Sequence, residues 1–228
     1  MTGVYDYTVI LTYLSLISAN IGIFLALGDN KIYASALCLM LCGLFDAFDG
    51  KVARTKKNRT DYEKKFGIQI DSLTDIVAFG VLPVCIAVAM MKQSVFFIGN
   101  SKILVIFCYG ITVLYVVAAL IRLAHFNVVE DERQEHEGGA NRFYTGVPVT
   151  AASLLFPTIL LVQYVTQKDL TLVYLIFLIV TGFAFISTIR VCKPKDRHIF
   201  LMIAIGVIEI VIVILVWQFG HKQPLYFF

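Results

Sequence analysis

Residues 32–54 read IYASALCLMLCGLFDAFDGKVAR, and this stretch decides how the chain folds. Residues 32–45 are mostly apolar, as in a helix that crosses a membrane, but residues 46–54 then carry two aspartates, a glycine and an arginine. Charged side chains within a membrane are costly and are retained at functional sites. The stretch therefore predicts a membrane helix that ends in a binding or catalytic site.

The rest of the chain shares this apolar character. Of its 228 residues 59% are hydrophobic and 15% are charged, whereas soluble domains are about half apolar and a quarter charged. We predict an all-α integral membrane protein with a single domain over residues 1–228 and about seven transmembrane helices, within a range of six to eight because residues 84–107 can be divided in more than one way. The predicted spans are 6–27, 32–49, 71–92, 102–126, 147–165, 170–190 and 198–219.

The basic residues predict the orientation of these spans. Fourteen of the 19 Lys and Arg residues lie in three connections, at 50–70, 122–146 and 190–197. By the positive-inside rule these connections face the cytoplasm of a multi-pass protein of the cell membrane, with the N-terminus inside and the C-terminus outside. The formal net charge of +3 comes from these loops beside anionic membrane lipids, and it indicates no nucleic-acid partner.

Four aspartates form two pairs on consecutive helices. Asp46 and Asp49 share one face of the second span, and Asp71 and Asp75 share one face of the third. Because the two antiparallel helices are joined on the cytoplasmic side, the pairs lie at the same depth and can face each other. Four carboxylates at this depth repel one another, so the pattern predicts a bound cation and an active site that faces the cytoplasm.

The ligand types favour particular ions. Carboxylate oxygens without histidine or thiolate suit Mg²⁺ or Mn²⁺, and four carboxylates can hold one or two such ions, as in phosphoryl transfer. The alternative is that the aspartates cap helix ends and pair with Lys51, Arg54 and Lys56. Beside them, Gly50 and Ala53 keep one helix face small for a nucleotide, although close helix packing is an alternative for such a face.

At these residues the pattern can be assigned to a family. DAFDGKVAR (46–54) followed by GIQIDSLTD (67–75) resembles the signature of the CDP-alcohol phosphotransferases, D-x2-D-G-x2-A-R and then G-x3-D-x3-D. Its eight fixed positions are filled by Asp46, Asp49, Gly50, Ala53, Arg54, Gly67, Asp71 and Asp75. The spacer at 55–66 has twelve residues, where the family usually has eight or nine, and we interpret the excess as a longer cytoplasmic turn.

The resemblance implies an integral-membrane helical bundle, usually a homodimer with a six-helix core. It implies an enzyme that transfers a phosphatidyl-type group from a CDP-linked lipid to an alcohol and releases CMP. By the same resemblance the four aspartates hold one or two divalent ions, Asp75 is also the general base, and the CDP-linked lipid is bound at Gly50, Ala53, Arg54 and Gly67.

Three further segments are similar to the phosphatidylserine synthase branch: DSLTDIVAFGVLP (71–83), IRLAHFNV (121–128) and FYTGVPVTAA (143–152). The branch implies transfer from CDP-diacylglycerol to L-serine by metal-assisted direct displacement. Serine carries a carboxylate and needs a cation nearby, so we name Arg122, Asn127 and Arg142 as candidate serine ligands. Alternatively, Arg122 extends to the membrane surface as an interfacial arginine, and Arg142 only follows the positive-inside rule.

Other functions remain open from the sequence. Glycerol phosphate or inositol phosphate could be the acceptor, and CDP-archaeol could be the donor. A divalent-cation transporter is a remote alternative, because the acids lie at the membrane rim and not at its midplane. Glu209, in the middle of the seventh predicted span, we assign to packing or to an interface between subunits.

Overall fold

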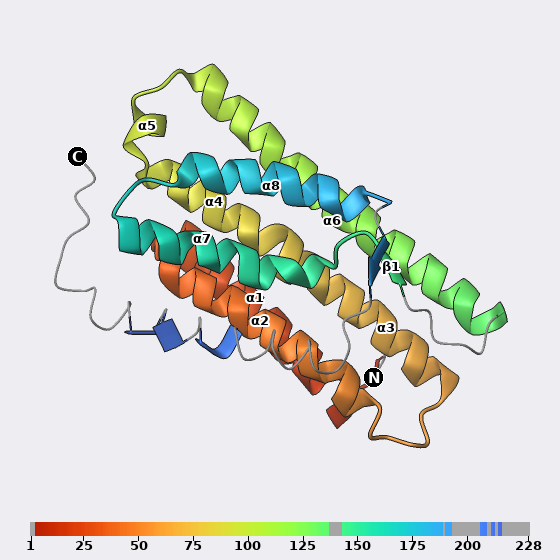
Figure 1. Ribbon diagram of the computed structural model, residues 1–228. Helices are drawn as coiled ribbons and strands as arrows, with labels where there is room; N and C mark the ends of the chain where they lie inside the picture. Colours follow the sequence, from red (N-terminus) through yellow and green to blue (C-terminus); the bar gives the residue numbers. More distant parts are fainter. Residues whose placement is uncertain are drawn as a thin grey trace.

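The computed structural model describes residues 3–136, 143–188, 190–192, 206–208, 211–212 and 214–215. In these residues the chain is a bundle of long helices, with the turn between α2 and α3 at the same end as the N-terminus (Figure 1). A short antiparallel pair of strands, Phe143–Thr145 (β1) and Arg190–Cys192 (β2), lies beside the bundle. The predicted all-α membrane fold is confirmed, with this small strand pair as an addition.

The helices follow one another in a simple order. They are α1 (Ile10–Leu27), α2 (Ile32–Ala53), α3 (Asp61–Asp75), α4 (Leu82–Gln93), α5 (Val95–Ile98), α6 (Lys102–His136), α7 (Ala152–Thr166) and α8 (Thr171–Ile186). A π-helical segment, η2 (Ile76–Val81), joins α3 to α4, and 3₁₀ turns at Tyr7–Val9 (η1) and Val149–Ala151 (η3) precede α1 and α7.

Five of these helical stretches are long and apolar enough to cross a membrane. They are Tyr7–Leu27, Ile32–Ala53, Asp61–Gln93, Lys102–Val129 and Val149–Thr166, and the shorter apolar helix Thr171–Ile186 follows. They match the first six predicted spans and make this a multi-pass membrane protein. Most of the seventh predicted span, 198–219, lies outside the described residues.

The third helix begins ten residues earlier than predicted. Its start is a capping box, in which the Glu63 amide donates to the Thr60 hydroxyl at 3.2 Å and the Thr60 amide donates to the Glu63 carboxylate at 2.8 Å. Hydropathy placed the start at Asp71 because residues 61–66 are mostly charged or polar. Asp71 and Asp75 therefore lie within a continuous helix and not at its first turn.

Glycine residues allow close packing between the helices of the bundle. α1 packs against α2 and also against α3. A Cβ added to Gly22 of α1 would lie 2.9 Å from the Cβ of Cys38, so only glycine permits this approach of α1 to α2. On α2, Gly43 faces Ser153 of α7 in the same way. Small residues at such crossings are typical of membrane helices.

An aromatic cluster fills the core where α6, α7 and α8 meet the third membrane stretch. It consists of Tyr115, Phe156, Tyr174 and Phe185, all essentially inaccessible to solvent. The Tyr115 hydroxyl donates to the carbonyl oxygen of Phe79 in η2 at 2.9 Å. The π-helical segment η2 begins directly after Asp75. Such segments are rare and occur frequently at functional sites. The aromatic cluster thus holds the helix on which Asp75 lies.

Candidate active site

Three of the predicted carboxylates come together between two helices. Asp46 and Asp49 of α2 and Asp71 of α3 each offer an oxygen atom, and these atoms all lie within 4.8 Å of one another. All three residues are partly buried. Among the salt bridges of the described residues, none involves these three aspartates. We call Asp46, Asp49 and Asp71 the carboxylate group.

Asp75 lies one turn beyond Asp71 on α3. It is only 8% exposed, and its charge interacts with all three members of the carboxylate group, although its oxygens are not part of that 4.8 Å set. Thr12 of α1, which the sequence did not indicate, interacts with the Asp49 carboxylate through its side chain. The site is therefore built by α1, α2 and α3 together.

The donor atoms of the carboxylate group fit a hard divalent cation. They are oxygens from three carboxylates, without a histidine or cysteine ligand, which is the set that Mg²⁺ and Mn²⁺ prefer. Like charges this close, in a helix bundle that crosses a membrane, also need a positive partner. The group can thus hold a divalent ion.

The small face of α2 is open beside these carboxylates. Apart from its chain neighbours and the adjoining helix backbone, no described atom lies within 4 Å of a Cβ built on Gly50, and Gly50 and Arg54 are both exposed. Ala53 is partly buried. Close helix packing, the alternative for this face, does not occur at Gly50 among the described helices. A ligand can approach the α2 backbone there.

Gly67, in contrast, is covered. A Cβ at this position would lie 2.7 Å from Nη2 of Arg59, so the guanidinium group rests directly on the glycine. Arg59 belongs to the twelve-residue spacer and was not among the predicted site residues. Only the length of the spacer, which departs from the family pattern, could have drawn attention to it.

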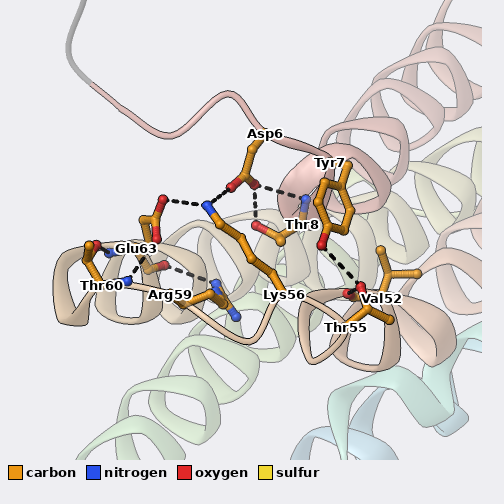
Figure 2. A network of polar contacts seen from close by, with 9 residues as sticks. All are labelled: Asp6, Tyr7, Thr8, Val52, Thr55, Lys56, Arg59, Thr60 and Glu63. Carbon is orange, nitrogen blue, oxygen red and sulfur yellow. Dashed lines mark hydrogen bonds and ion pairs between the residues drawn. The ribbon is translucent and has the colours of Figure 1, made fainter.

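The spacer is anchored by a lysine with two acidic partners. Lys56 donates to Asp6 at 2.6 Å and to Glu63 at 2.7 Å, and the Thr55 hydroxyl contacts that of Tyr7 at 3.4 Å (Figure 2). The hydrogen bond from Lys56 lowers the pKa of Asp6 to about 2. Lys56 is therefore not a partner of the carboxylate group, which contradicts the alternative that it neutralises those aspartates.

The candidate serine ligands have different surroundings. Arg122 of α6 is 6% exposed, and its Nε donates to the carbonyl oxygen of Val147 at 3.3 Å. It is therefore a buried arginine, and the interfacial alternative is wrong. Asn127 donates to the Ser72 hydroxyl at 2.9 Å and accepts from it at 3.1 Å, which ties α6 to α3 one residue from Asp71.

Two residues considered from the sequence, Arg142 and Glu209, lie outside the described residues. Their predicted roles remain predictions. Ser72 was not predicted as a site residue. Its position next to Asp71 in the motif is the signal that could have indicated it.

Comparison with known families shows the family to which the chain belongs. The sequence profile of the CDP-alcohol phosphatidyltransferases matches residues 8–220. The chain belongs to this family. The resemblance read from the motif is thereby confirmed, and so is the prediction of a membrane-embedded transferase of phospholipid metabolism.

Individual relatives of this CDP-alcohol phosphatidyltransferase fall in one branch. A CDP-diacylglycerol–serine O-phosphatidyltransferase of Helicobacter pylori is 29% identical over 177 residues, which cover 74% of this chain and 67% of the relative. An archaetidylserine synthase of Methanothermobacter thermautotrophicus is 32% identical over 158 residues, which cover 69% of this chain and 59% of that relative. A CDP-diacylglycerol–serine O-phosphatidyltransferase of Saccharomyces cerevisiae is 33% identical over 149 residues, which cover 64% of this chain and 48% of that relative. The matches thus span between about half and two thirds of these relatives.

Proposed function

We propose that the chain transfers the phosphatidyl group of CDP-diacylglycerol to L-serine, forming phosphatidylserine and CMP. The observation that carries this proposal is the carboxylate group, in which motif residues of α2 and α3 meet within 4.8 Å. The names of the relatives from Helicobacter pylori and Saccharomyces cerevisiae support serine as the acceptor.

The proposed cofactor is Mg²⁺ or Mn²⁺, as one or two ions held by Asp46, Asp49 and Asp71, with Asp75 as a further ligand. Such an ion supplies charge neutralisation to the diphosphate and makes CMP a better leaving group. The fit rests on the oxygen donors of the carboxylate group. The protein's part is to hold these donors on two helices that α1 keeps in place.

The residues around the ion have separate proposed tasks. The open backbone at Gly50, together with Ala53 and Arg54, binds the cytidine nucleotide. Asp75 accepts the proton of the serine hydroxyl, which attacks the phosphorus that bears diacylglycerol as CMP leaves. Asp75 is suited to this task by its position, because it is only 8% exposed and lies one turn beyond Asp71 on the same helix.

Arg122 and Asn127 are the proposed contacts of serine, with Arg142 as a third. Arg122 supplies a buried cation for the serine carboxylate. Asn127 is already hydrogen-bonded to Ser72, next to Asp71, so it reaches the same end of α3. We place this end of the bundle at the cytoplasmic face because the basic connection 50–70 lies there, and we expect a homodimer from the family resemblance.

A second donor has one observation in its favour, the similarity to an archaetidylserine synthase. That relative's name indicates an archaeal lipid, so CDP-archaeol is the alternative donor. Glycerol phosphate and inositol phosphate are the alternative acceptors.

One assay tests the proposed function. Purified protein is given Mn²⁺, CDP-diacylglycerol or CDP-archaeol, and one of serine, glycerol 3-phosphate or inositol phosphate, and CMP release is followed. We expect release that depends on serine and is lost in Asp75→Asn. Release with only another acceptor would contradict the serine proposal, and a phosphatidyl group trapped on a histidine would contradict direct displacement.

A further inference from the structure

Arg59 is held at a defined place on α3 by backbone atoms. Its Nη2 donates to the carbonyl oxygen of Glu63 at 3.0 Å. The same nitrogen lies 2.7 Å from where a Cβ of residue 67 would be, so the guanidinium group is seated on the glycine backbone. Any larger residue at position 67 would displace it.

This seat lies on the same helix face as the aspartates. Glu63, Gly67, Asp71 and Asp75 follow one another at intervals of four residues, which places them along one face of α3. Four residues correspond to a rise of about 6 Å. The guanidinium group of Arg59 therefore lies about one turn before Asp71 along α3.

Arg59 has no carboxylate partner among the described residues, although acids lie nearby (Figure 2). Glu63 is fully engaged, since one carboxylate oxygen accepts from Lys56 and the other from the amide of Thr60. Lys56 also engages Asp6. Two cations of the spacer thus differ: Lys56 forms two salt bridges, and Arg59 forms none with the described residues.

The donors of Arg59 are also not all used. Its Nε is buried and has no hydrogen-bond partner among the described residues. A buried donor without a partner costs free energy. A ligand that accepts a hydrogen bond from this donor removes that cost, so an unpartnered buried donor indicates a ligand site. A planar guanidinium group binds phosphate oxygens through two parallel hydrogen bonds, which a lysine cannot do.

We propose that Arg59 binds a phosphate group of the CDP-linked donor and that the longer spacer adds this contact to the motif residues. This inference rests on the proposed function, because it takes a nucleoside diphosphate as the ligand. Ions held by the carboxylate group would neutralise part of the charge of the diphosphate, and Arg59, about one turn away on the same face of α3, would donate hydrogen bonds to its phosphate oxygens. Lys56 is a positioning residue, since its bonds to Asp6 and Glu63 hold the spacer against α3.

The experiment measures the binding of CDP to the purified protein by calorimetry in the presence of Mn²⁺. We expect Arg59→Gln to weaken CDP binding about tenfold or more, the loss that fits one charge-assisted hydrogen-bonded contact. Arg59→Lys keeps the charge but not the paired geometry, so we expect an intermediate affinity. Lys57→Gln, which removes a neighbouring exposed cation of the same spacer, is the matched control and should bind CDP as the wild type does.

Kinetics separate a binding role from a merely structural one. Arg59→Gln should raise the KM for CDP-diacylglycerol while the KM for serine and the unfolding temperature without nucleotide stay unchanged. Unchanged CDP affinity in Arg59→Gln would overturn the proposal. So would an equal loss of CDP and serine affinity together with a lower unfolding temperature, or the absence of CDP binding to the wild type.

The outcome also distinguishes this inference from the proposed function, because CDP binding needs no acceptor. If the wild type binds CDP through Arg59 but releases no CMP with serine, the acceptor assignment fails and the Arg59 contact stands. If serine turnover is normal and Arg59→Gln changes neither the affinity nor the KM, the Arg59 contact fails and the function stands.

Discussion

The helical stretch Asp61–Gln93 passes through two regions of opposite character. In its second half, the buried hydroxyls of Tyr115 and Tyr174 donate to the carbonyl oxygens of Phe79 and Pro83, and the rings pack without exposure. In its first half, Asp71 faces two other carboxylates with no salt bridge among the described residues. The aromatic region is complete without a ligand, whereas the carboxylate region needs one. Substitutions in the two regions should therefore have opposite effects on stability and activity.

The largest effect on activity is expected from Asp71→Asn. Loss of one metal-binding carboxylate should lower CMP release on the order of 10²–10³-fold, because the charge of the diphosphate is then poorly neutralised. The unfolding temperature should stay the same or rise, since repulsion within the carboxylate group decreases. Asp61→Asn, at the exposed start of the same helix, is the control and should change neither quantity. A clear loss of stability in Asp71→Asn would contradict the comparison.

The aromatic region should respond in the reverse way. Phe156→Ala removes a fully buried ring that packs on Tyr115 and Tyr174. We therefore expect the free energy of unfolding in mixed micelles to fall by about 3–5 kcal/mol. The fraction that remains folded should keep its KM for CDP-diacylglycerol. Phe183→Ala removes the same ring from a position of α8 that is 67% exposed, so it leaves no cavity and should have little effect. Equal losses in both variants would show that the cluster is not the core we describe.

The smallest effect is expected from Lys56→Gln, which removes partly exposed ion pairs at the edge of the carboxylate region. The folded-state pKa of Asp6, about 2, lies below its unfolded value of about 3.9. The pair therefore stabilises the fold above pH 4, and this contribution is lost as the pH falls toward 2.

The unfolding temperatures of wild type and Lys56→Gln should thus differ slightly at pH 6 and converge between about pH 4 and pH 2. Lys64→Gln, which removes the more exposed pair with Asp61, is the matched control, and its unfolding temperature should differ less from that of the wild type at pH 6. A difference that grows on acidification would contradict the sign of the effect.

The sequence predicted the spacing of the aspartates, and hence which of them share a helix face, because helical geometry is local. It also predicted the first six spans from hydropathy. It placed the start of the third helix wrongly, since hydropathy reports membrane contact and not helix formation; the capping box of Thr60 and Glu63 was the signal to use.

Contacts between distant residues could not be predicted in the same way. The pairing of Lys56 with Asp6 joins residues fifty positions apart, and the seat of Arg59 on Gly67 depends on how the spacer turns. Neither has a periodic pattern in the sequence. The burial of Arg122 was likewise not predictable, because it depends on the segment around Val147 that covers it.

The most direct test of the central claim is a titration of the purified protein with Mn²⁺, followed by electron paramagnetic resonance in the presence of CDP. We expect the wild type and Asp61→Asn to bind one or two ions, and Asp46→Asn and Asp71→Asn to lose this binding. Unchanged Mn²⁺ binding in Asp46→Asn and Asp71→Asn would contradict the claim that α2 and α3 together form the metal site.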